Sequence, residues 1–152
     1  MNSSDTQFAQ SYQPLRCYSR GERIGLLFLG LFLSALLTVA VWLKPNPAGL
    51  GTHTQLGLPG CTMFTLLGVR CPGCGMTTAW AHTMNGDLAS AIQANVGGVL
   101  LCFLSIIAAP VLIWLAIRGK PIASPWSAQF AIASLVVAVS ISFIEWMIRL
   151  AF

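Results

Sequence analysis

Three long apolar segments stand out along the chain, at residues 24–43, 96–117 and 127–148, with polar sequence around them. The first two contain no charged residue, and the third contains Glu145 alone, close to its end. A helix of about 20 residues rises about 30 Å, the thickness of the hydrocarbon core of a bilayer. The pattern therefore predicts an all-α integral membrane protein, a bundle of about three transmembrane helices.

Small residues recur at intervals of three or four within each apolar segment, which places them on one face of a helix. Such faces allow transmembrane helices to approach one another closely. We therefore expect packing through three stripes: Gly30, Ser34 and Thr38; Gly98, Cys102, Ser105 and Ala109; and Ser134, Ala138 and Ser142.

The remaining sequence divides into a polar tail over 1–23 and a connection over 44–95, so that 24–149 form a single membrane domain. The first apolar segment has a competing interpretation as a cleaved signal peptide. Both the polar tail and the apolar run are long for a signal peptide, so we expect a retained membrane anchor.

The connection contains loop and short helix. Prolines and glycines between residues 45 and 60 predict loop. Residues 75–84 are predicted to form a short helix of about 15 Å, about half the depth of a bilayer core, which favours an interfacial or re-entrant position. Asn85-Gly86 predicts a turn, and Asp87 is expected to cap the helix that follows.

Charge is scarce in this chain. Charged residues make up 8% of the sequence, whereas a soluble domain has about 25%. So few charges exclude a water-soluble globule of this size. The formal charge of +4 comes from basic residues that flank the apolar segments. A lipid bilayer is therefore the expected partner and nucleic acid is not, with other membrane subunits or a second copy of the chain as candidate protein partners.

The basic residues are divided unequally between the two sides of the predicted bundle. The side with more of them is expected to be cytoplasmic. This rule predicts a cytoplasmic N-terminus and places the connection over 44–95 on the outer side. The larger group is Arg16, Arg20, Arg23, Arg118 and Lys120, and the smaller group is Lys44, Arg70 and Arg149.

The sequence Cys71-Pro72-Gly73-Cys74 is the main chemical signal in the connection. Proline is favoured at the first position of a helix, so Cys71 is expected near an N-cap, where the helix dipole lowers the pKa of a thiol. A redox pair would use Cys71 as the attacking thiol and Cys74 as the resolving one. The βαβ pattern that accompanies thioredoxin-like pairs is missing from the sequence.

A metal site is a second interpretation of the same residues. Two cysteines separated by two residues supply half of a zinc site, and Cys61 is a candidate for a third sulfur. His82 or His53 is a candidate for the fourth ligand. Two copies of the chain would also supply four sulfurs by pooling their pairs.

A structural disulfide is the third interpretation, because thiols on the outer side of a membrane tend to oxidise. Cys61 would then bridge to Cys71 or Cys74. The leading hypothesis is a non-enzymatic membrane component with a structural or redox-responsive cysteine cluster. The alternatives are a structural zinc site, a membrane thiol-disulfide oxidoreductase, and a scaffold or accessory subunit of a membrane complex.

The residues around this motif also resemble a known family. Cys61, then Gly68-Val69-Arg70-Cys71-Pro72-Gly73-Cys74-Gly75-Met76-Thr77-Thr78-Ala79, then Gly86-Asp87-Leu88 and residues 91–95 are similar in order and spacing to the DUF2752 family of small bacterial membrane proteins. The resemblance implies a multi-pass protein of the bacterial inner membrane and supplies no reaction. It singles out as motif positions Cys61, Cys71, Pro72, Gly73, Cys74, Gly75, Thr77, Asp87 and Asn95.

The chain departs from the family pattern at two positions. Thr78 stands where the family usually has arginine, and Val96 stands where it usually has proline after Asn95. Any role of that arginine in binding an anion or supporting the motif is therefore expected to be lost or moved in this chain.

Overall fold

The computed structural model describes residues 17–121 and 126–151. Over these residues the chain forms α-helices and one 3-10 helix, with no strand. The elements are, in order, α2 (Arg20–Trp42), η1 (Thr52–Leu56), α3 (Thr62–Leu67), α4 (Met76–Met84), α5 (Leu88–Ala94), α6 (Val96–Arg118) and α7 (Trp126–Ala151).

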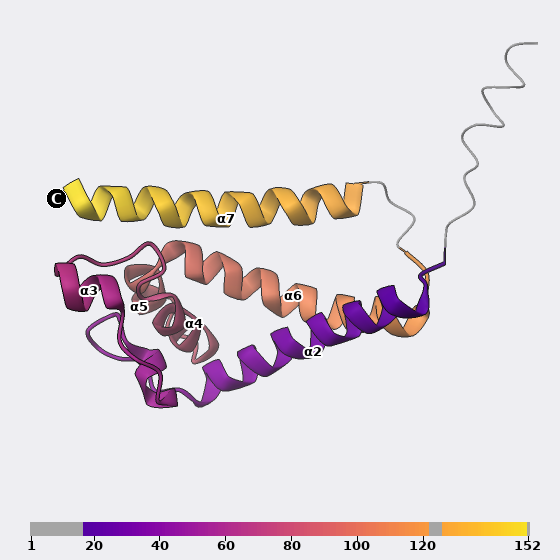
Figure 1. Ribbon diagram of the computed structural model, residues 1–152, viewed down its shortest axis with the longest axis horizontal. Coiled ribbons are helices and arrows are strands. Elements are labelled where there is room, and N and C mark those ends of the chain that lie inside the picture. Colours follow the sequence, from indigo (N-terminus) through magenta and orange to yellow (C-terminus); the bar gives the residue numbers. More distant parts are fainter. Residues whose placement is uncertain (1–16, 122–125, 152) are drawn as a thin grey trace, which may run out of the picture.

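Three of these helices are long and apolar enough to cross a membrane: Arg20–Trp42, Val96–Arg118 and Gln129–Ala151. Helices α2 and α6 lie side by side and run in opposite directions, and α7 lies along the other side of α6 (Figure 1). The prediction of an all-α bundle with three spanning helices is confirmed.

Helix α2 begins four residues before the predicted apolar segment because its polar start is well capped. The Ser19 hydroxyl accepts a hydrogen bond from the Glu22 N–H at 3.3 Å, and the Glu22 carboxylate accepts one from the Ser19 N–H at 2.7 Å. This reciprocal pair satisfies two N–H groups that a helix start otherwise leaves unbonded. The helix therefore includes Arg23, whose guanidinium donates to the Ala116 carbonyl at 2.8 Å and joins the start of α2 to the end of α6.

The stripe of small residues predicted on α6 is buried, and the stripes predicted on α2 and α7 are buried in part. On α6, Cys102 and Ala109 are buried, and on α7 the residues facing it include Ala138 and Ser142. The approach is closest at Gly97, where an added Cβ would lie 2.5 Å from the Cβ of Ser142. Only a hydrogen side chain leaves room for α7 at this point.

The stripe predicted on α2 is wrong at one position. Gly30 is buried, whereas Thr38 is exposed and its hydroxyl bonds within its own helix. A repeat of four residues advances about 40° beyond a full helical turn, so two such steps carry a side chain away from the interface. The buried face of α2 continues instead to Ala40.

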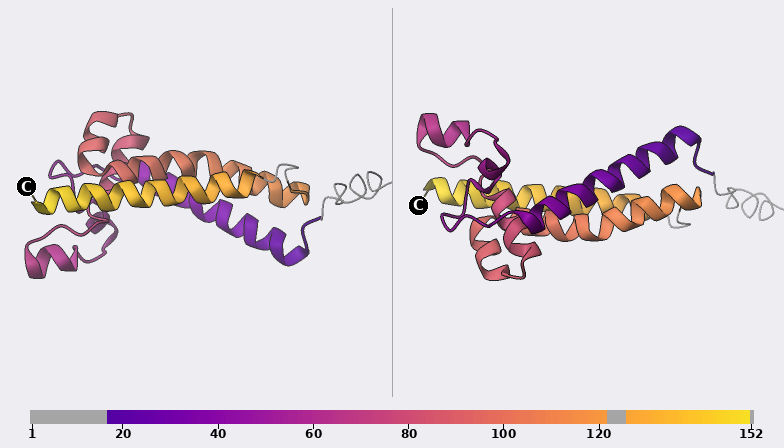
Figure 2. Two further views of the ribbon diagram at one scale, coloured as in Figure 1. Left: turned by 90° about the horizontal axis from the view of Figure 1, so that it is seen from above. Right: turned by 90° about the horizontal axis from the view of Figure 1, so that it is seen from below.

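The short elements gather at one end of the bundle, beside the C-terminal end of α7 (Figures 1 and 2). Helix α4 covers Met76–Met84, which confirms the short helix predicted over 75–84. It packs against α5 and α6 through a small apolar core of Ala79, Ala91, Ala94 and Val99. Helix α3 projects from this end, with its last two leucines largely exposed.

Candidate metal centre

Three sulfur atoms converge at this end of the bundle. The Sγ atoms of Cys61, Cys71 and Cys74 all lie within 4.8 Å of one another. Cys61 is the N-cap of α3, and the other two lie in the turn that precedes α4. All five cysteines are free thiols in the structure, and the other two, Cys17 and Cys102, lie outside this group.

The turn from Cys71 to Cys74 is held together by hydrogen bonds, one of which is accepted by a sulfur atom. The N–H of Cys71 donates to the Sγ of Cys74 at 3.3 Å, and the Cys71 thiol lies 3.3 Å from the same sulfur. The N–H of Cys74 donates to the Cys71 carbonyl at 3.0 Å. This turn brings the two sulfurs together and directs a backbone donor at one of them.

The expected position of Cys71 at a helix N-cap is wrong. Helix α4 begins at Met76, and its N-cap is Gly75, which has a φ of 85°. Pro72 therefore lies in the turn and not at the first helical position. Residues 71–74 form a separate turn, closed by the bond from the Cys74 N–H to the Cys71 carbonyl. The left-handed backbone of Gly75 separates this turn from α4, a conformation that glycine adopts readily.

The thiol with a lowered pKa is that of Cys61. The backbone N–H of Phe64 is the main cause, followed by the Cys74 and Cys71 thiols, and together they lower the pKa of Cys61 from 9.0 to about 7. Burial is the main cause of the opposite change at Cys74, whose pKa rises to about 12. A thiolate is therefore readily formed at Cys61, next to a buried thiol that needs a partner charge before it ionises.

A cavity of about 540 Å³ opens beside the three sulfurs. His53 lines it together with the cysteines, and the Nε2 of this residue lies 3.1 Å from the Pro59 carbonyl oxygen. A carbonyl oxygen only accepts hydrogen bonds, so Nε2 carries the proton and Nδ1 of the neutral ring keeps its lone pair. Metal-binding histidines commonly show this arrangement, with one ring nitrogen bonded to a carbonyl.

His82 lies elsewhere. It is in the last turn of α4, where its Nδ1 is 3.2 Å from the Asp87 carboxylate, and it is not part of the sulfur group. Asp87 also accepts a hydrogen bond from the Ser90 N–H at 3.1 Å, which confirms it as the N-cap of α5. The Ser90 hydroxyl, then the Ser90 N–H, and to a smaller extent His82 lower the pKa of Asp87.

Asn95 is the central polar residue beneath the cysteine turn, and its side chain is only 3% exposed. Its amide NH₂ donates to the Pro72 carbonyl at 3.3 Å and to the Cys74 carbonyl at 3.2 Å. Its oxygen accepts from the Gly98 N–H at 2.6 Å and so caps α6. The sequence singled out Asn95 as a motif position, but these partners are revealed only by the structure.

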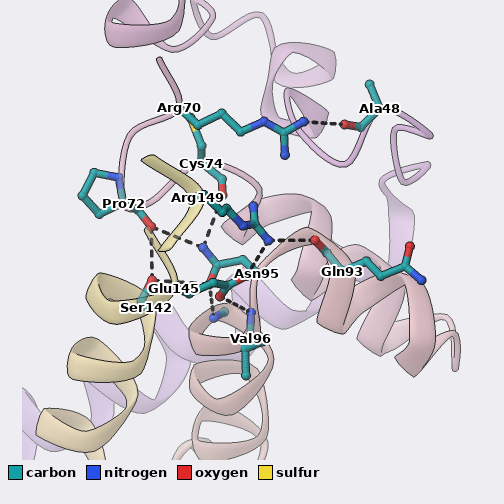
Figure 3. Close-up of polar contacts among 11 residues, drawn as sticks. Ala48, Arg70, Pro72, Cys74, Gln93, Asn95, Val96, Ser142, Glu145 and Arg149 are labelled. Atoms are coloured by element: carbon teal, nitrogen blue, oxygen red, sulfur yellow. Dashed lines mark hydrogen bonds and ion pairs between the residues drawn. The ribbon is translucent and has the colours of Figure 1, made fainter. Parts of the chain in front are cut away.

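Helix α7 completes the site from the far end of the chain (Figure 3). The Ser142 hydroxyl donates to the Pro72 carbonyl at 3.1 Å, and the indole N–H of Trp146 donates to the Arg70 carbonyl at 2.6 Å. The sequence predicted only a helix-packing role for Ser142, as part of a stripe of small residues. No sequence signal links Ser142 or Trp146 to the cysteine turn, because both lie about 70 residues away along the chain.

Glu145 and Arg149 form an ion pair four residues apart on α7, and both residues have further partners. Glu145 accepts a hydrogen bond from the Val96 N–H at 2.8 Å, and Arg149 donates to the Gln93 carbonyl at 2.8 Å. A proline in place of Val96 would have no N–H for this contact. The departure from the family pattern at this position therefore matches a bond to α7.

The second departure, Thr78, is fully buried. Its hydroxyl lies 2.8 Å from that of Thr52, which is also fully buried, and this contact fastens η1 to α4. Thr77 lines the cavity beside the sulfurs. Where the family pattern usually has an arginine, this chain thus has Thr78, whose buried hydroxyl pairs with that of Thr52.

Comparison with known families agrees with this geometry. Residues 61–109 match the family described as "Protein of unknown function (DUF2752)". The match includes the three converging cysteines and the first part of α6, and it leaves out α2 and α7. Comparisons with curated proteins and with solved structures give no match. The segment of this chain that carries the cysteine site is therefore similar to the DUF2752 family, and the match covers about a third of the chain.

Proposed function

We propose that this chain is a non-enzymatic membrane component that binds one zinc ion through Cys61, Cys71 and Cys74. The observation that carries the proposal is the convergence of three sulfurs within 4.8 Å of one another, beside a cavity. Zinc bound by sulfur is tetrahedral with bonds of about 2.3 Å, so neighbouring sulfurs of one site lie close to 4 Å apart. A disulfide would use two of these sulfurs and leave the third without a role.

The protonation of the three thiols also suits a metal ion. Zinc takes thiolates, and it releases their protons when it binds. Cys61, with its pKa lowered to about 7, supplies a thiolate to begin this process. The N–H of Cys71 that points at the Cys74 sulfur would stabilise a second thiolate in the completed site.

The location of the site fits a structural role at the membrane surface. The sulfurs lie at the end of the bundle opposite to the start of α2 and the end of α6, where Arg20 and Arg118 are found (Figure 1). With the basic end in the cytoplasm, the zinc would hold together the loops on the outer face of a bacterial inner membrane.

Metal content tests the proposal directly. Protein purified in detergent is expected to contain about one zinc per chain by elemental mass spectrometry, and Cys61→Ser, Cys71→Ser and Cys74→Ser are each expected to lower zinc affinity at least about tenfold. Cys17→Ser, at an exposed position outside the group, is the matched control and should retain the metal. A metal-free wild-type protein that also fails to take up added zinc would contradict the proposal.

A disulfide between Cys71 and Cys74 is the second candidate, because their sulfurs are only 3.3 Å apart. It predicts an intact mass lower by two hydrogens without reductant, and no zinc uptake until a reductant is added. Mass spectrometry of the untreated protein therefore separates the two candidates.

The fourth ligand to the zinc is expected to be His53. Its ring lines the same cavity as the sulfurs, and its bond to Pro59 leaves Nδ1 without that contact. Its ring nitrogens lie outside the group of converging sulfurs, so binding would require the ring to move toward them. His53→Ala is expected to weaken zinc binding about tenfold and to alter the absorption spectrum of the cobalt-substituted site. His82→Ala is the control, because His82 pairs with Asp87 outside the sulfur group. Equal affinities and spectra for both variants would show that water or another group takes this position.

A further inference from the structure

We infer that Trp146 and Ser142 of α7 are positioning residues for the cysteine site, so that metal binding and the docking of α7 are coupled. The inference rests on the zinc site proposed above, and it adds a helix that lies outside the family segment. Its basis is two hydrogen bonds that α7 makes to the backbone of the cysteine turn, one from Trp146 and one from Ser142. Figure 3 shows the bond from Ser142 to the Pro72 carbonyl.

Alternate backbone carbonyls along this turn, those of residues 70, 72 and 74, each accept a hydrogen bond from a side chain. Trp146 donates to the Arg70 carbonyl at 2.6 Å, and Ser142 donates to the Pro72 carbonyl at 3.1 Å. The Cys74 carbonyl, the third in this series, is held by Asn95. Fixing these three carbonyls restricts the backbone rotations around the cysteines, and the directions of the two Sγ atoms follow from those rotations.

Trp146 acts on one peptide group in particular. The peptide that joins Arg70 to Cys71 accepts the indole N–H through its oxygen, and it donates through its nitrogen to the Cys74 sulfur at 3.3 Å. Hydrogen bonds in series polarise one another, so the indole strengthens the donor that faces sulfur. The Trp146 side chain therefore acts on the cysteine site through a single peptide group.

Ser142 fixes the second contact and the helix packing together. Its Cβ lies where a Cβ on Gly97 would come within 2.5 Å, so α6 and α7 are in close contact at this point. Its hydroxyl also lies 3.4 Å from the oxygen of Asn95. Movement of α7 away from α6 would therefore remove one of the two donors to the Pro72 carbonyl and disturb Asn95, which is the other donor, at the same time. By linkage, a zinc ion that prefers the fixed turn also stabilises the docked position of α7.

The test compares matched variants of the full chain in detergent. Trp146→Phe keeps the ring and removes the N–H, and Ser142→Ala removes only the hydroxyl. Each is expected to lower zinc affinity about tenfold by competition with a chelator and to shift the cobalt ligand-field spectrum, because residues that orient metal ligands have effects of this size. Trp114→Phe and Ser134→Ala are the controls, since Trp114 stacks on Arg118 and the Ser134 hydroxyl bonds within α7. Both controls should match the wild type.

Two further measurements separate the possible results. Zinc is expected to slow amide hydrogen exchange in the last turns of α7 of the wild type, and this slowing should shrink in Trp146→Phe. In zinc-free protein, the buried Cys74 is expected to be alkylated several times faster in both α7 variants than in the controls, which tests the contact even if the wild type binds no metal. Unchanged zinc affinity, cobalt spectrum and alkylation rate in both α7 variants would overturn the inference.

Discussion

Gly75→Ala is expected to destabilise the protein by about 4 kcal/mol and to abolish zinc binding. The φ of Gly75 is 85°, a conformation that costs an alanine about 1–2 kcal/mol. The added Cβ would also lie 2.6 Å from the Ala94 carbonyl oxygen and 2.8 Å from that of Gly49. Both neighbours are backbone, so neither can rotate away, and the residue next to Cys74 has to move.

Gly73→Ala is the matched control for this substitution. Gly73 lies in the same turn and lines the same cavity, but a Cβ there meets nothing within 4 Å. Its free energy of unfolding is expected to stay within about 1 kcal/mol of the wild type. Denaturation in mixed detergent micelles measures both variants. Equal stability of the two would show that the segment around Gly75 relaxes at little cost.

Asn95→Ala is expected to cost about 3 kcal/mol of stability, because it removes several bonds at one buried point. The Cys74 carbonyl loses its side-chain donor, the Pro72 carbonyl keeps only the donor from Ser142, and the first turn of α6 loses the cap on the Gly98 N–H. An unsatisfied buried group costs about 1–3 kcal/mol, and loss of an N-cap about 1 kcal/mol. The same denaturation experiment reports the total.

Asn95→Asp separates the cost of losing the helix cap from the cost of losing the donors to the two carbonyls. Aspartate keeps the oxygen that accepts from Gly98 but cannot donate to the two carbonyls of the turn. We expect it to remain nearly as destabilised as Asn95→Ala and to bind zinc poorly. Asn85→Ala is the control, since this exposed asparagine makes one side-chain bond, to the Ala81 carbonyl. Wild-type stability in Asn95→Asp would mean that the cap alone accounts for the role of Asn95.

Much of the fold was readable from local sequence. Uncharged runs of about bilayer length identify spanning helices, because the unsatisfied backbone of any other structure is too costly in lipid. The Asp87 cap and the short helix after Cys74 also follow from local rules, since both depend on contacts between residues within one turn of each other. The stripe predicted on α7 contains Ser142, which lies at the close contact with α6, but its neighbour there is Gly97, which is outside the stripe predicted on α6.

Local reasoning failed where a turn depended on distant support. The helix start expected near Cys71 moved to Met76, because the peptide groups of residues 71–74 bond to sulfur and to side chains of Asn95, Ser142 and Trp146. Proline at a helix start is a statistical preference of isolated segments, and it carries no information about carbonyls that α7 will occupy.

The sequence by itself determined that this chain is a three-span helical membrane protein, and which cysteines to examine. Only the tertiary structure decided that Cys61 joins Cys71 and Cys74, that His53 and not His82 shares their cavity, and that α7 supports their turn. The physical reason is one of range. Hydrophobicity and capping act between near neighbours along the chain, whereas the position of a sulfur atom depends on every backbone contact that distant helices make with its turn.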